Sequence, residues 1–229
     1  GGFMVLHHAK TGTNEAFDFR EMAPAKAHSK MFLDKNGKQV TERSLTGALA
    51  SGVPGLVAGV LEVHAKYGKL DLKTVMQPAI ELAEKGMKVY PALERAIKAK
   101  AEKLCRFEAS KKIFLNKDCS GLKAGEMLYQ KDLAETLKLI AEKKRKGFYQ
   151  GKVARLIAAS QKKHGGYMTT KDIANYKVKN RKPVVGTYKG YKIVSMPPPS
   201  SGGTHVIQIL NILEGYDLKS LGAQSAEAI

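Results

Sequence analysis

Short runs with the periodicity of β-strands lie near both ends of the chain, and helical periodicity fills the stretch between them. Residues 2–8 and 15–20 are separated by a turn-forming cluster at 10–14, which predicts a hairpin. Residues 183–188 and 191–196, separated by Lys189-Gly190, predict a second hairpin. We expect the two hairpins to join one sheet with the helical stretch forming a lobe beside it, so the sequence indicates an α+β fold.

Apolar residues at helical spacing predict the helices of the middle stretch. One begins near Pro54 and ends before Gly68, and Gly86 is placed to end the next. The predicted helices are 72–85, 91–104, 131–146 and 152–163. Beyond the second hairpin, a last helix is indicated by the helical spacing of Val206, Ile207, Leu210 and Leu213. A turn is predicted at residues 34–37. No repeat of constant period links these segments.

The chain of 229 residues carries a formal net charge of +18, which favours anionic partners. Its lysines and arginines are scattered through the predicted helices, it has no tryptophan, and no aromatic residues alternate with a basic stripe. This pattern indicates a solvated basic surface rather than a dedicated nucleic-acid site. No window approaches about 18 consecutive apolar residues, so no membrane span is predicted.

Cys105 and Cys119 match no zinc motif, and the histidines form no His-Glu-x-x-His pattern. Neither a metal site nor a cofactor is therefore predicted. Two interpretations of the cysteines remain open: two thiols, or a disulfide that closes a loop of about 15 residues.

Residues 197–203 (PPPSSGG) indicate a turn between a strand and a helix. Ser200 or Ser201 is expected to cap that helix, and a backbone nest for an anion is the alternative. His205, which follows the turn, is interpreted as a structural histidine.

Residues 18–24 (DFREMAP) hold the strongest candidate for ligand binding. Arg20 stands between Asp18 and Glu21 at the expected end of the second strand, where the chain leaves the sheet. Its guanidinium can pair internally with Asp18 or Glu21, or it can present its planar fork to a carboxylate on a ligand.

This motif continues through residues 31–34 (MFLD) and is followed by residues 50–59 (ASGVPGLVAG) and 196–205 (MPPPSSGGTH). In this order and spacing, the set resembles bacterial γ-glutamyltranspeptidase (γ-glutamyltransferase) over essentially the whole chain. The resemblance implies the N-terminal-nucleophile hydrolase fold, an αββα sandwich. The chain then corresponds to an interior piece of the large subunit, without the N-terminal helices and the small subunit. We expect one partial domain over 1–229, with a strand pair and Arg loop at 1–40, a helical lobe at 41–180, and a strand pair and helix at 181–229.

The resemblance also implies an activity and a partner. Arg20 is expected to bind the α-carboxylate of a γ-glutamyl group, which is transferred from glutathione to water, amino acids or peptides. The nucleophile of the family is the N-terminal threonine of the small subunit, within a Thr-Thr-His-Tyr-type sequence that does not occur here; Thr169-Thr170 is followed by Lys171. We therefore expect no catalytic residue in this chain, no activity from it alone, a heterodimer with the small subunit, and a periplasmic or secreted location.

Two alternatives stay open. One is an acylase of the same superfamily that acts on glutaryl β-lactams, since Arg20 would also bind the carboxylate of a glutaryl group. The other is a non-enzymatic basic module that binds nucleic acid or acidic surfaces.

Overall fold

The computed structural model describes residues 1–222, 224–227 and 229. The chain forms two compact units. The first contains residues 1–62 and 161–229, and the second contains residues 63–160. The chain leaves the first unit within helix α2 (Leu56–Tyr67) and returns within α8 (Gly151–Lys163).

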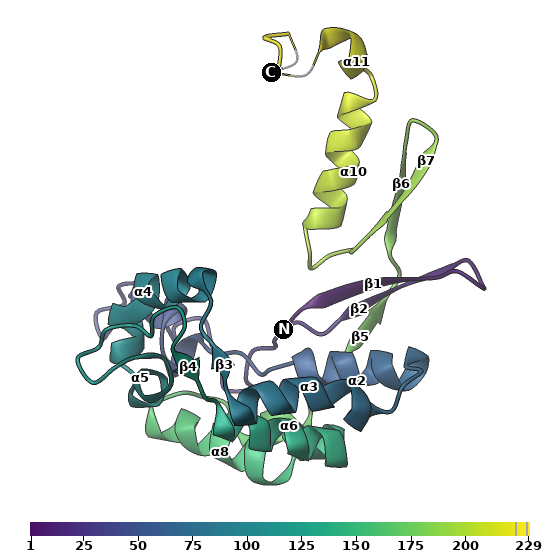
Figure 1. Ribbon diagram of the computed structural model, residues 1–229. Coiled ribbons are helices and arrows are strands. Elements are labelled where there is room, and N and C mark those ends of the chain that lie inside the picture. The colour runs from purple at the N-terminus through teal and green to yellow at the C-terminus, as the bar shows by residue number, and fades with distance from the viewer. Residues whose placement is uncertain (223, 228) are drawn as a thin grey trace. The chain divides into compact units, whose positions relative to one another are not determined.

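The first unit contains a three-stranded antiparallel sheet in the order β1-β2-β5, visible in Figure 1. Its strands are β1 (Phe3–His8), β2 (Thr13–Asp18) and β5 (Lys179–Arg181). The hairpin predicted for the start of the chain is thus confirmed. β2 is the middle strand, and its residues Ala16 and Phe17 are each 1% exposed. Because consecutive residues of a strand point to opposite faces, the end of β2 is held by packing on both faces of the sheet.

The second predicted hairpin also forms, as β6 (Val184–Tyr188) and β7 (Tyr191–Ser195). The prediction that both hairpins join one sheet is wrong, because β6 and β7 pair only with each other among the described residues. β5 is the strand that extends the first sheet. Pro183 separates β5 from β6 and has no amide N–H to donate, so a hydrogen-bonded ladder cannot continue through it.

Helix α10 (Gly202–Leu213) packs against the β6–β7 hairpin. The helix begins directly after Ser200 and Ser201, the two residues expected to cap it. Gly186 in β6 permits this contact, since a Cβ there would collide with the side chain of Ile207. The remaining helices of the first unit are short: α1 (Thr41–Leu45), the 3₁₀ turn η1 (Ala48–Ala50), α9 (Thr170–Ala174) and α11 (Leu218–Leu221).

The second unit is mainly helical, and its central contact is between α3 (Leu72–Lys85) and α6 (Lys131–Lys143). The sequence predicted both ends of α3. Asp71 accepts a hydrogen bond from the backbone N–H of Lys73, and Gly86 ends the helix with φ +85°.

One helix prediction in this unit is wrong. Residues 131–146 do not form a single helix, because Lys144 has φ +51° and separates α6 from α7 (Arg145–Tyr149). Gly147 sits so close to the carbonyl of Leu139 that a Cβ would not fit. The break therefore allows α7 to fold back onto the end of α6.

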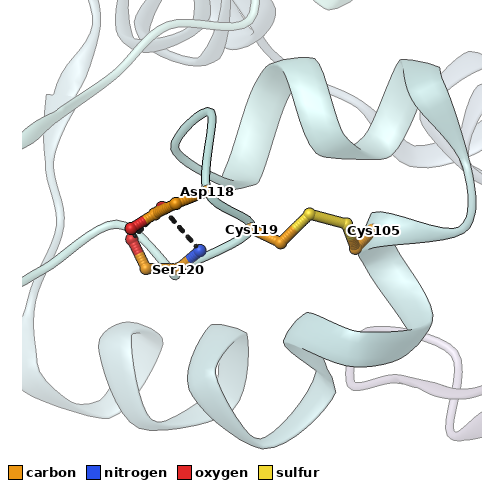
Figure 2. Close-up of a disulfide and its surroundings, with 4 residues drawn as sticks. All are labelled: Cys105, Asp118, Cys119 and Ser120. Atoms are coloured by element: carbon orange, nitrogen blue, oxygen red, sulfur yellow. Dashed lines mark hydrogen bonds between the residues drawn. A yellow bond between two sulfur atoms is a disulfide. The ribbon is translucent and has the colours of Figure 1, made fainter.

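The other elements of the second unit are α4 (Pro91–Cys105), α5 (Glu108–Phe114) and the short strands β3 (Met87–Lys88) and β4 (Met127–Leu128). Cys105 at the end of α4 forms a disulfide with Cys119, and their Cα atoms lie 5.7 Å apart (Figure 2). This decides between the two interpretations that the sequence left open. No helix in the described residues is long and apolar enough to span a bilayer.

Candidate functional site

Arg20 lies two residues beyond the end of β2, where the chain leaves the sheet as predicted. Its side chain is 50% exposed and lines a cavity of about 340 Å³ in the first unit. The residues that line this cavity come from three stretches of the chain: Asp18, Arg20, Glu21, Met22, Tyr176, Lys177, Lys179, Arg181 and Pro199. The candidate ligand-binding residue therefore faces an accessible space.

The guanidinium of Arg20 is held on one side only. Its Nε donates to Oε1 of Glu21 at 3.2 Å, and its Cζ lies 5.8 Å from the centre of the Phe3 ring. In the part of the chain that the structure describes, no hydrogen bond or ion pair engages its Nη1 and Nη2 groups. These two terminal groups form the planar edge that binds a carboxylate through paired hydrogen bonds.

The pKa of the Glu21 carboxyl is lowered from its ordinary value of 4.5. A hydrogen bond from its own backbone N–H makes the largest contribution, and the bond from Arg20 and the charge of Arg20 add to it against the opposing effect of burial. Glu21 is therefore ionised near neutral pH and fixes the Nε side of the guanidinium.

Asp18, by contrast, does not pair with the guanidinium of Arg20. Its Oδ1 accepts a hydrogen bond from the backbone N–H of Arg20 at 3.1 Å, and its Oδ2 accepts one from Nε of Arg181 at 2.8 Å. Of the two internal partners considered from the sequence, Glu21 pairs with the side chain of Arg20, and Asp18 accepts a hydrogen bond from its backbone N–H.

The backbone carbonyl of Arg20 is also bonded, since it accepts a hydrogen bond from the hydroxyl of Tyr176 at 2.8 Å. Tyr176 is 2% exposed. Gly55 packs against both the Tyr176 hydroxyl and the Phe19 carbonyl, and Gly59 packs against the Phe19 ring. The glycines of the 50–59 motif therefore allow close packing against Phe19 and Tyr176, the residues that adjoin the Arg20 backbone.

The loop after Arg20 is attached at two further points. Met22 and Val53 exchange backbone hydrogen bonds of 3.2 and 2.7 Å. The backbone N–H of Ala25 donates to Oδ1 of Asp172 at 2.9 Å, and Asp172 also forms a capping box with Thr169 at the start of α9. Burial raises the pKa of Asp172, but the bonds from Thr169 and Ala25 outweigh it and leave this pKa below its ordinary value.

The Pro-Pro-Pro-Ser-Ser-Gly-Gly turn precedes α10, as predicted. Ser200 performs the capping, because its Oγ accepts from the N–H of Gly202 at 3.3 Å, whereas Ser201 makes no side-chain cap bond. Pro199 from this turn reaches the cavity of Arg20. His205 is exposed and makes no side-chain hydrogen bond within the described residues, so its interpretation as a structural histidine is wrong.

The sequence did not identify Arg181 or Tyr176 as parts of this site. Both lie more than 150 positions from Arg20 along the chain, and neither stands in a motif that points to it. The described residues contain no group of three or more histidine, cysteine or acidic side chains arranged to hold a metal ion.

Comparison with known proteins shows the family of this chain. The family model for Gamma-glutamyltranspeptidase matches residues 1–229. This chain belongs to that family. The Glutathione hydrolase proenzyme of Escherichia coli (strain K12) is 48% identical over 230 residues, which cover 100% of this chain and 39% of that protein. The chain therefore spans about two fifths of the length of this curated relative.

A solved structure supports the same assignment. The gamma-glutamyltranspeptidase of Helicobacter pylori superposes with a TM-score of 0.95 at 50% identity, covering 99% of this chain and 64% of that one. The predicted α+β fold class and the predicted family are thus confirmed. A more distant relative, the Acylase ACY 1 proenzyme of Pseudomonas sp. (strain SE83), is 40% identical over 235 residues, which cover 100% of this chain and 42% of that protein.

Proposed function

We propose that Arg20 binds the α-carboxylate of a γ-glutamyl donor. The observation that carries this proposal is the state of its guanidinium: Nε is held by Glu21, Nη1 and Nη2 have no partner among the described residues, and the side chain lines a cavity. A carboxylate is the anion that best matches this edge, since two parallel charge-assisted bonds form with it. Lys177 and Lys179 also line the cavity and add positive charge.

We further propose that the protein containing this chain transfers the γ-glutamyl group of glutathione to water, amino acids or peptides. The nucleophile is the N-terminal threonine of a small subunit, which is the partner of this chain in a heterodimer. The threonine oxygen bonds to the γ-carbonyl carbon as the C–N bond breaks, and the threonine proton passes through its own α-amino group to the leaving amine. Water or an amine then takes the acyl group and restores the hydroxyl.

In this reaction Arg20 acts at a distance from the bond that breaks. The α-carboxylate and the γ-carbonyl are opposite ends of the glutamyl group, so fixing the first places the second before the nucleophile. The chain is expected to be inactive alone, because it supplies the arginine that binds the donor but not the nucleophile. The Cys105–Cys119 disulfide supports a periplasmic or secreted location, because structural disulfides persist in oxidising compartments.

The test compares two donors on the full-length protein: γ-glutamyl anilide, and 4-aminobutyryl anilide, which lacks the α-carboxylate. Hydrogen bonds to charged groups contribute about 1.5–3 kcal/mol each, so losing both with Arg20→Met lowers kcat/KM for the γ-glutamyl donor by about 100-fold or more. The 4-aminobutyryl donor should react almost as before.

Arg20→Lys should recover only part of the loss, since an ammonium cannot form the paired bonds. Arg155→Met is the matched control: it removes an exposed arginine from α8, which contributes no residue to the cavity. An equal loss for both donors in Arg20→Met contradicts the assignment of Arg20 to the α-carboxylate.

A second candidate function is that of a glutaryl β-lactam acylase. The 40% identity to an acylase proenzyme supports this candidate. A glutaryl group retains a carboxylate at the position that Arg20 would bind but lacks the α-amino group. Comparing kcat/KM of the full-length protein for γ-glutamyl anilide and for a glutaryl β-lactam distinguishes the two, and we expect the γ-glutamyl donor to be preferred.

A further inference from the structure

Two residues far from the Arg20 motif in the sequence hold the two sides of the Arg20 peptide backbone. Arg181 acts on the amide side through Asp18, and Tyr176 acts on the carbonyl side directly. Together with the Nε bond to Glu21, these contacts restrict both the start and the middle of the Arg20 side chain.

Asp18 is the central group of the amide side. It is only 6% exposed, yet each carboxylate oxygen has a donor: Oδ1 the N–H of Arg20 and Oδ2 the Nε of Arg181. A carboxylate this buried is stable only when it is paired and hydrogen-bonded. Arg181 is therefore the group that keeps a charged Asp18 at the end of β2, aligned with the Arg20 backbone.

The sheet register explains how Arg181 reaches this position. β5 runs antiparallel to β2, with Arg181 opposite Ala16 and Lys179 opposite Asp18. Arg181 is thus one diagonal step from Asp18, within reach of a long side chain. β5 is only three residues long and mostly exposed, so this ion pair is a principal contact between its side chains and the site.

The carbonyl side depends on Tyr176, which follows α9. Its ring is almost fully buried, and its hydroxyl donates to the Arg20 carbonyl at 2.8 Å. Because the ring is packed against Gly55, the hydroxyl has little freedom to follow a displaced carbonyl.

We propose that Arg181, acting through Asp18, and Tyr176 are positioning residues that hold the Arg20 guanidinium in the orientation that binds the donor carboxylate. This rests on the proposed role of Arg20. These contacts of Arg181, Asp18 and Tyr176, which we call the clamp, fix the backbone from which the guanidinium extends. The donor carboxylate therefore does not have to order the Arg20 backbone when it binds. Releasing one side displaces the guanidinium, and a misplacement of about 1 Å reduces the rate by about 100-fold.

The test measures α-carboxylate discrimination in the full-length protein, defined as kcat/KM for γ-glutamyl anilide divided by kcat/KM for 4-aminobutyryl anilide. We expect Arg181→Met to lower this ratio about 10- to 100-fold, mostly through KM of the γ-glutamyl donor. Arg181→Lys should restore part of it, since an ammonium still neutralises Asp18. Lys182→Met, which removes the adjacent exposed charge, is the matched control and should leave the ratio unchanged.

The double variant Arg20→Met/Arg181→Met separates positioning from direct contact with substrate. If Arg181 acts through Arg20, the double variant has the same ratio as Arg20→Met. A further decrease would show that Arg181 binds the substrate itself and would overturn the proposal. Tyr176→Phe, which removes only one hydroxyl, should lower the ratio by a smaller factor and keeps the clamp testable if Arg181→Met does not fold.

Failure of the clamp and failure of the proposed function give different results. A ratio that is unchanged in Arg20→Met refutes the role of Arg20. A ratio that falls in Arg20→Met but stays at the wild-type value in Arg181→Met and Tyr176→Phe, with only the melting temperature reduced, leaves that role intact. It assigns the two residues to stability alone and overturns the positioning proposal.

Discussion

Removing the Cys105–Cys119 disulfide should loosen α5 far more than α6. Figure 2 shows the bond joining the end of α4 to the loop that follows α5, so α5 lies inside the closed loop. The two cysteines are 14 positions apart. In the chain-entropy model, a loop of about 15 residues loses about 3 kcal/mol of opening free energy when the link is cut.

Native-state hydrogen exchange of the full-length protein measures this free energy locally. When exchange follows the population of the open state, about 3 kcal/mol corresponds to roughly 150-fold faster exchange. We expect this acceleration for α5 amides in the double variant Cys105→Ser/Cys119→Ser. Amides of α6 lie outside the loop and serve as an internal control.

Local hydrogen bonds do not substitute for the link. Asp118 accepts bonds from the N–H and the hydroxyl of Ser120, and Leu115 pairs with Gly121, but these contacts join residues 115–121 to one another and do not tie them to α4. Adding a reductant to the wild-type protein should reproduce the exchange of the double variant, and adding it to the variant should change nothing. Unchanged exchange in α5, or an equal acceleration in α6, would refute a local restraint.

Two further predictions concern the surroundings of Arg20. Gly55→Ala places a Cβ against the Tyr176 hydroxyl and the Phe19 carbonyl, so it should destabilise the protein by about 1–3 kcal/mol and raise KM for the γ-glutamyl donor; Gly215→Ala, where a Cβ meets only ordinary contacts, is the control for both the melting temperature and KM. Glu21 has a folded-state pKa below its ordinary value of 4.5, so its contribution to stability is present above that pH and is lost as the pH falls through the lower value. Urea unfolding of the wild type and Glu21→Gln should therefore differ by less than about 1 kcal/mol at pH 7, since the Arg20–Glu21 pair is half exposed, and the difference should decrease in acid; a difference that grows in acid contradicts the assigned sign.

The elements that could be predicted from the sequence are those with signals inside their own residues. α3 has apolar spacing, an aspartate at its start and a glycine after its end, and its observed bounds agree with the prediction. The break after α6 has no such signal, because it falls on Lys144, a residue that rarely adopts a positive φ.

β5 shows the same limit for strands. Its sequence, Lys-Asn-Arg, has neither alternation nor β-branched residues, and its extended shape comes from pairing with β2. Secondary structure that is determined by a distant partner leaves little trace in a local pattern.

The candidate site likewise contains one residue that the local sequence identifies and others that it does not. Arg20 could be identified because its neighbours in the sequence form an unusual motif that matches a family. Its clamp could not, because Arg181 and Tyr176 approach it only after β5 pairs with β2 and α9 packs beneath the loop. The motif therefore predicts which residue binds, whereas the fold determines how firmly that residue is held.

All the side chains that line the cavity, or that brace Arg20, belong to residues 1–62 or 161–229. The second unit contributes none of them among the described residues, although it contains the disulfide. The proposed donor-binding arginine is thus oriented entirely by contacts within the first unit. It follows that the cysteine variant, however much it accelerates exchange in α5, should keep the α-carboxylate discrimination of the wild type. A change in that ratio would mean that the orientation of Arg20 depends on the second unit, and the account of the clamp as a self-contained device would have to be abandoned.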